Sequence, residues 1–84
     1  MASLNVTDVT RIATDAAREL SPRLHVVGVT SGARDGRYAE VIIDIAQCRQ
    51  EPCRVFLEVF RNTSESVLHH EIADKLQRRV KTRL

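Results

Sequence analysis

The sequence predicts an α+β fold of two layers, with two helices on one face of a three-stranded antiparallel sheet. Segments near both ends repeat apolar residues at helical spacing, whereas three segments between them have the β-branched composition or the alternating pattern of strands. The connections between the strand segments are short, which favours antiparallel hairpins over crossovers. The element order is therefore α-β-β-β-α, and the 84 residues give room for one domain over residues 1–84.

The first helix is predicted to start at Asn5 and to end near Leu20. The side-chain oxygen of Asn5 can accept a hydrogen bond from the backbone N–H of Asp8, as helix N-cap residues do. Pro22 disfavours helical geometry at Ser21, so the helix should not continue past this point. One face of the helix carries the apolar residues Val9, Ile12, Ala13, Ala16 and Leu20.

The first strand is predicted from Leu24 to Thr30. Within it, Gly28 indicates either a β-bulge or the close approach of another backbone. Residues 31–36 should form the turn that follows, and Asp35-Gly36 is the strongest turn signal in this stretch.

The second and third strands, Tyr38 to Ala46 and Cys53 to Arg61, are predicted to form a hairpin around a loop at residues 49–52. Pairing Ile43 with Leu57 keeps the apolar residues of both strands on one face. The face predicted to be buried carries Val41, Ile43, Ile45, Val55, Leu57 and Val59. The opposite, open face carries charged residues together with Ile42, Phe56 and Phe60.

The second helix should begin at Thr63 or Ser64, both good N-cap residues, with Glu65 in the first turn where it suits the helix dipole. Its apolar stripe consists of Leu68, Ile72, Ala73, Leu76 and Val80. We expect this stripe to pack on the same face of the sheet as the first helix.

The element order over residues 5–82 resembles that of the double-stranded-RNA-binding domain. That family places a lysine cluster at the start of its second helix, after a glycine-rich approach. Here the segment from Ser64 to Glu71 contains neither lysine nor arginine, and Arg61-Asn62-Thr63 precedes it. The resemblance therefore implies the topology alone, and no functional residue of the family carries over.

The open face supplies the candidate protein interface, formed by Ile42, Phe56 and Phe60. Contiguous exposed apolar side chains usually mark interaction sites, and a small domain that buries little surface gains from association. We therefore predict an interaction module that forms a homodimer, or binds another protein, through this face. Alternatively, the basic tail or long polar side chains cover the three residues, or the helices pack elsewhere.

The last ten residues form a basic tail without any acidic residue, composed of Lys75, Arg78, Arg79, Lys81 and Arg83. The rest of the chain holds eight of the 13 basic residues against all 11 acidic ones, so it is net negative. The tail could bind the phosphates of a nucleic acid such as RNA, which is the alternative function. It could equally complement the helix dipole and form a solvated helix face.

Cys48 and Cys53 are predicted not to form a disulfide. The favoured register points Cys53 toward the core and Cys48 to the other face, unless a bulge near the loop brings them together. Their spacing is not that of a zinc site. His69 and His70 point about 100° apart on a helix and cannot chelate one ion together. We expect His69 to be partly buried, His70 to point outward, and no metal site.

The sequence predicts a protein that is not an enzyme and has no cofactor. It lacks a nucleophile elbow, a phosphate-binding loop and a glycine-rich βα turn. Glu40, Asp44 and Glu58 share the open face, but solvated carboxylates lack the cleft that would shift their pKa values. No apolar run approaches the roughly 18–20 residues of a membrane span. The N-terminus lacks the features of a secretory signal, and two cysteines are no disulfide framework, so we expect a cytoplasmic protein.

Overall fold

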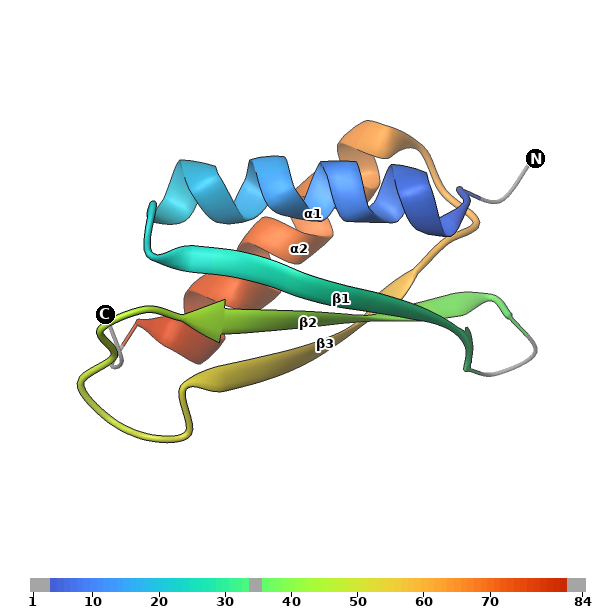
Figure 1. Ribbon diagram of the computed structural model, residues 1–84. Helices are drawn as coiled ribbons and strands as arrows, with labels where there is room; N and C mark the ends of the chain where they lie inside the picture. The colour runs from blue at the N-terminus through green and yellow to red at the C-terminus, as the bar shows by residue number, and fades with distance from the viewer. Residues whose placement is uncertain (1–3, 34–35, 82–84) are drawn as a thin grey trace.

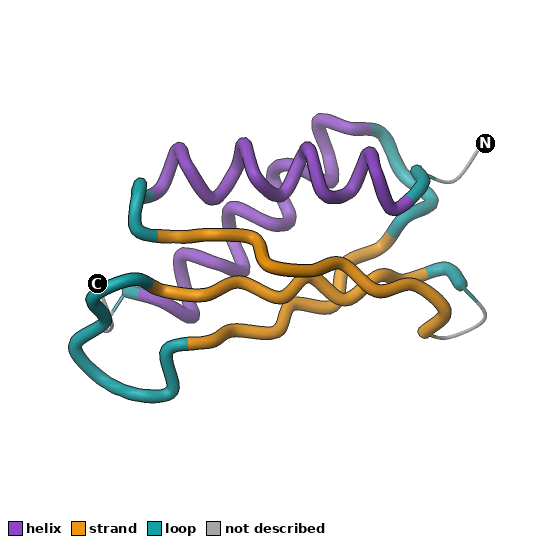
Figure 2. The backbone as a smooth tube through the Cα atoms, viewed as in Figure 1, coloured by secondary structure: helices purple, strands orange, loops and turns teal. Residues whose placement is uncertain are grey.

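The computed structural model describes residues 4–33 and 36–81, and its elements follow the predicted order (Figure 1). They are α1 (Val6–Leu20), β1 (Leu24–Ala33), β2 (Tyr38–Ile45), β3 (Arg54–Phe60) and α2 (Glu65–Val80). The strands form one antiparallel sheet in the order β1-β2-β3. Both helices lie as a second layer over one face of this sheet, which confirms the predicted α+β fold (Figure 2).

Both helices begin at the predicted N-cap residues. The backbone N–H of Asp8 donates to Asn5 Oδ1 at 2.7 Å, and that of Val67 donates to Ser64 Oγ at 3.3 Å. These bonds satisfy N–H groups that have no partner within the first turn of a helix. Helix α1 ends at Leu20 because the next residue, which precedes a proline, has an extended backbone.

The core lies between the two layers and consists, among the described residues, only of apolar side chains. The six strand residues predicted to face the helices are all buried: Val41, Ile43, Ile45, Val55, Leu57 and Val59. Both predicted helix stripes are buried as well, apart from Leu20 and Ala73, which are partly buried against the same cluster. In the described part of the chain, no helix is long and apolar enough to cross a membrane.

The pairing of β1 with β2 contains the irregularity that Gly28 indicated. Val26 pairs with Ile43 and Gly28 pairs with Ile42, so Val27 is an extra residue on β1, as in a β-bulge. A Cβ on Gly28 would stand 3.7 Å from the Ile42 side chain. Strand β1 runs three residues beyond the predicted end. Asp35 of the predicted turn lies outside the described residues, whereas Gly36 has a φ of +79°, a conformation that glycine adopts readily.

The register of β2 with β3 differs from the predicted one by two residues. Ile43 pairs with Val55 and Val41 pairs with Leu57, where the sequence predicted Ile43 opposite Leu57. The loop between these strands is longer than expected, because β2 stops at Ile45 and β3 starts only at Arg54. A shift by two residues leaves every side chain on its predicted face, since the pattern of a strand repeats every two residues.

The prediction that Cys48 and Cys53 stay unbonded is wrong. The two residues form a disulfide with a Cα–Cα distance of 5.9 Å. The prediction extended the alternation of the strand to Cys48, but this residue lies in the loop beyond the end of β2. Gln47 has a φ of 53° in the left-handed region, and the loop bends back toward Cys53, whose carbonyl accepts a 2.8 Å hydrogen bond from Ile45. Alternation of faces does not hold in such a loop.

Candidate interaction surface

The face of the sheet that points away from the helices, here called the outer face, carries an apolar row across all three strands. The register aligns Gly28 of β1, Ile42 of β2 and Phe56 of β3. Phe56 is 48 % exposed, and Ile42 is partly buried between its neighbours. Two of the three predicted interface residues, Ile42 and Phe56, therefore lie directly opposite each other on adjacent strands.

Phe60, the third predicted residue, lies further along β3 and is only partly exposed. It pairs with Tyr38 across the strands, and their rings meet edge to face with centroids 5.3 Å apart. Edge-to-face contacts stabilise aromatic pairs, and here the Tyr38 ring covers part of the Phe60 ring. Phe56 is thus the more accessible of the two phenylalanines.

Val27 belongs to the apolar row, although the sequence analysis did not select it. In a bulge, two residues of one strand stand opposite one residue of the other, and here Val27 and Gly28 stand opposite Ile42. Val27 is 51 % exposed, whereas the residues of β2 and β3 that face the helices are buried. Simple alternation from Leu24 would place Val27 correctly on the outer face, and the glycine after it was the available signal for the bulge.

Charged side chains flank the apolar row on both sides. On one side, His25, Asp44 and Arg54 lie opposite one another on the three strands. The guanidinium of Arg54 donates hydrogen bonds of 2.6 and 3.1 Å to the carboxylate of Asp44. This guanidinium lowers the pKa of the Asp44 carboxyl, chiefly through its hydrogen bond, and the carboxylate raises the pKa of Arg54 in return. On the other side, Glu40 of β2 lies directly opposite Glu58 of β3 in the strand register.

The free edge of β3 is covered by side chains from α2. Lys75 Nζ donates to the Glu58 carbonyl at 2.6 Å, and Arg79 donates to the Phe56 carbonyl at 3.4 Å. The Phe60 N–H donates to a carboxylate oxygen of Glu71 at 3.3 Å. Long polar side chains thus occupy backbone groups that could otherwise pair with another strand. One alternative from the sequence was that such side chains cover Ile42, Phe56 and Phe60, but here they lie on the backbone edge of β3 and the side chain of Phe56 stays exposed.

The basic tail is only partly available for other contacts. Lys75 also pairs with Glu71 at 2.8 Å, and Arg78 pairs with Asp74 at 3.1 Å. Lys75, Arg78 and Arg79 line a pocket of about 270 Å³ beside Leu57 and Glu58. Two further residues were predicted to contact nucleic acid. Lys81 directly follows α2, and Arg83 lies outside the described residues.

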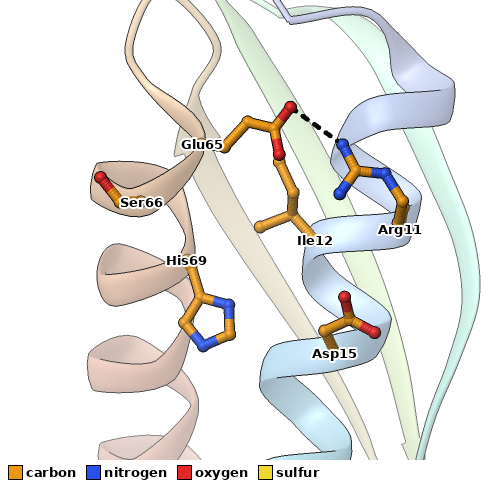
Figure 3. A pocket seen from close by; sticks show the side chains of 6 residues that line it. All are labelled: Arg11, Ile12, Asp15, Glu65, Ser66 and His69. Atoms are coloured by element: carbon orange, nitrogen blue, oxygen red, sulfur yellow. Dashed lines mark ion pairs between the residues drawn. The ribbon is translucent and has the colours of Figure 1, made fainter.

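A second pocket, of about 370 Å³, lies between the two helices (Figure 3). Arg11 and Asp15 of α1 line it on one side, and Glu65, Ser66 and His69 of α2 on the other. Arg11 pairs with Glu65 at 3.0 Å, and this hydrogen bond raises the pKa of the guanidinium. The charges of Arg11 and Glu65 therefore compensate one another, whereas Asp15 is a further carboxylate in the lining.

The histidines of α2 occupy the predicted positions. His69 is partly buried, with Nε2 3.2 Å from a carboxylate oxygen of Glu19, whereas His70 is exposed. Across the described ranges 4–33 and 36–81, no group of three His, Cys, Asp or Glu side chains is arranged to hold a metal ion. The inter-helix pocket offers no ligand set for a metal.

Comparison with protein-family models, with curated proteins and with solved structures yields no match to this chain. The function is therefore inferred from the chemistry of its own surface.

Proposed function

We propose that this chain is a small, non-enzymatic interaction module that associates with a second copy of itself through the outer face of its sheet. The observation that carries the proposal is the apolar row of Val27, Ile42 and Phe56, which crosses all three strands. Two of its side chains are about half exposed, where solvent contact with apolar surface is unfavourable. Covering this row by a second copy would remove that surface from water.

The size of the domain supports the same proposal. A chain of 84 residues buries a smaller fraction of its surface than a large protein does, so its stability gains from further burial. The covered edge of β3 disfavours association strand to strand at that edge, because its carbonyls already accept hydrogen bonds from Lys75 and Arg79. Association through the outer face is therefore favoured over association at the β3 edge.

Replacing Phe56 by Asp tests the proposal. We expect the wild-type protein to have the mass of a dimer by light scattering behind a sizing column, and F56D to have the mass of a monomer. Val67→Asp is the matched control, because Val67 is 56 % exposed but lies on α2, away from the outer face. A wild-type monomer at all accessible concentrations, or a dimer unaffected by F56D, would contradict the proposal.

A second candidate function is nucleic-acid binding by the basic tail. It is favoured by the gathering of Lys75, Arg78 and Arg79 around one pocket beside the sheet edge. Arg79 donates to the backbone carbonyl of Phe56, a contact that does not neutralise its charge. Affinity for a short RNA duplex should then fall linearly on a log–log plot against salt. An affinity that does not change with salt concentration, or the absence of binding at low salt, would argue against this function.

The cytoplasm is our proposed location, and the redox state of Cys48 and Cys53 tests it. Thiols trapped by alkylation in intact cells would be free in a reducing compartment, where disulfides are rare. Recovery of the disulfide from such cells would instead argue for an oxidising compartment.

A further inference from the structure

The Cys48–Cys53 disulfide closes a ring within a single loop. The two cysteines are five positions apart in the sequence, and both belong to the connection between β2 and β3. This connection projects beyond the end of the sheet (Figure 1). The bond therefore links neither the two helices to each other nor a helix to the sheet.

The bond lies outside the core and next to solvent. Both cysteines are only partly buried, and the residues between them, 49–52, are exposed. The buried core contains neither cysteine, although Cys48 packs against it. A small thiol that attacks the bond therefore does not require the core to open.

Hydrogen bonds hold both ends of the loop independently of the disulfide. Arg23 Nε donates to the carbonyl of Ala46 at 3.0 Å, and Arg23 Nη2 donates to the carbonyl of Gln47. The N–H of Ala46 donates in turn to the Arg23 carbonyl at 2.8 Å. The N–H of Ile45 donates to the Cys53 carbonyl, also at 2.8 Å. None of these contacts involves a sulfur atom, so cleavage of the S–S bond frees the loop between the cysteines and leaves β2 paired with β3.

The small ring limits how strongly the fold favours the disulfide. A disulfide stabilises the folded state by the same factor by which folding favours the disulfide over two thiols, because the two equilibria are coupled. For a ring of about six residues this factor is about 30-fold, whereas a ring of about 100 residues would give about 3,000-fold. The fold therefore protects this bond only weakly against exchange with small thiols.

We propose that Cys48–Cys53 is a site of reversible thiol–disulfide exchange, where a monothiol of the glutathione class opens the bond, releases the loop and leaves the strands paired. A first thiolate attacks one sulfur and forms a mixed disulfide, while the other cysteine leaves as a thiolate and takes up a proton. A second thiol cleaves the mixed disulfide, which yields two cysteine thiols and the oxidised dimer of the monothiol. The reverse steps re-form the bond. This chemistry is independent of the proposed self-association.

The exchange would give the domain a loop that responds to its redox environment. In a reducing compartment, such as the proposed cytoplasmic location, disulfides that do form are mostly transient, catalytic or redox-sensing. The pair would be reduced in resting cells and would close when the oxidised form of the monothiol accumulates.

Equilibration in mixtures of reduced and oxidised glutathione tests the proposal. Alkylation quenches the exchange, and intact mass separates the disulfide, the dithiol and the mixed disulfide. We expect the equilibrium constant for bond formation in the folded protein to exceed that of the urea-unfolded chain by about 30-fold. The reduced protein should keep its circular dichroism spectrum and regain the bond when oxidised glutathione is returned. A bond that glutathione reduces only in urea, or a reduced protein that is unfolded, would overturn the proposal.

Amide hydrogen exchange tests whether the opening stays confined to the loop. In Cys48→Ser/Cys53→Ser, which mimics the reduced state, the Ile45 and Ala46 amides should stay protected, because their hydrogen bonds do not involve the sulfurs. Arg23→Met is the matched variant, since it keeps both cysteines but loses the side-chain contacts to the loop carbonyls. Reduction should raise exchange at Ala46 more in this variant than in the wild type. Loss of protection at both amides in the double serine variant would show that the disulfide itself holds the strands together there, which overturns the proposal.

Discussion

At the scale of single residues, neighbouring side chains on α2 have opposite environments. Leu68 is fully buried between the helices and the sheet, whereas Val67, one position earlier, is 56 % exposed. The helical repeat of 3.6 residues makes this separation, because adjacent residues point about 100° apart. The apolar stripe in the sequence was sufficient to predict it, since only Leu68 of the two fits the spacing of Ile72, Leu76 and Val80.

Truncation at these two positions should have very different effects on stability. Leu68→Ala should lower the free energy of unfolding by about 2–5 kcal/mol, because it removes buried methyl groups and leaves a cavity. Val67→Ala should change it by no more than about 0.5 kcal/mol. Urea unfolding followed by circular dichroism measures both. Equal losses in the two variants would show that the burial assigned to α2 is incorrect.

The Asp44–Arg54 pair gives a residue-scale prediction on pH. Because the guanidinium lowers the pKa of Asp44 in the folded protein, the pair stabilises the fold at pH values above the ordinary aspartate pKa. This contribution is lost as the pH falls through the lowered pKa. Both side chains are exposed to solvent, so the effect should be small and should weaken with salt.

A carbon NMR titration of the Asp44 carboxyl group measures that shift directly. In Arg54→Met the pKa of Asp44 should return upward toward its ordinary value, because the hydrogen bonds and the positive charge are removed together. An unchanged pKa in this variant would exclude Arg54 as the cause.

At the scale of elements, local signals located the helices better than the strand pairing. Asn5 and Ser64 cap the helices with their own side chains; the sequence predicted the first of these caps and left the second open between Thr63 and Ser64. The register of β2 with β3 depends on how the loop after Ile45 turns, and this loop contains a left-handed Gln47 that nothing in its sequence demanded. Hydrophobic alternation predicted which residues of β2 and β3 face the helices. It could not distinguish between two registers that differ by two residues, because both keep the same residues on each face.

The disulfide in this loop should stabilise the domain. Cross-linking a loop of about six residues restricts the unfolded chain and should contribute about 2 kcal/mol. Thermal unfolding with and without reductant tests this, with Cys48→Ser/Cys53→Ser as the control that reductant cannot affect. A wild-type midpoint that stays constant after complete reduction, confirmed by intact mass, would show that the bond adds no stability.

At the scale of the whole molecule, the two layers leave one face of the sheet outside the core. Both helices pack on the opposite face, and their arrangement encloses every core residue of the described chain. The basic half of α2 reaches the β3 edge rather than the outer face, because Lys75 and Arg79 donate to carbonyls of that edge. Among the residues that the structure describes, charged side chains bound the apolar row and none covers it.

Self-association through this row should link stability to protein concentration. A ligand or partner that binds only the folded state stabilises it by mass action, and here the partner is a second copy. The thermal midpoint of the wild type should rise with concentration, whereas that of F56D should stay constant. Calorimetry over a hundredfold range of concentration provides the measurement, and equal behaviour of the two proteins would contradict dimer-linked stability.

The sequence by itself determined the element order, the start of α1 and the faces on which the residues of β2 and β3 lie. These features follow from spacing and capping, which act over a few neighbouring residues. Only the tertiary structure decided the β2–β3 register, the Cys48–Cys53 bond, and the bulge that sets both Val27 and Gly28 opposite Ile42. Each of these depends on how distant segments meet across a loop or a bulge, and one extra or missing residue there changes the contacts without changing the local pattern.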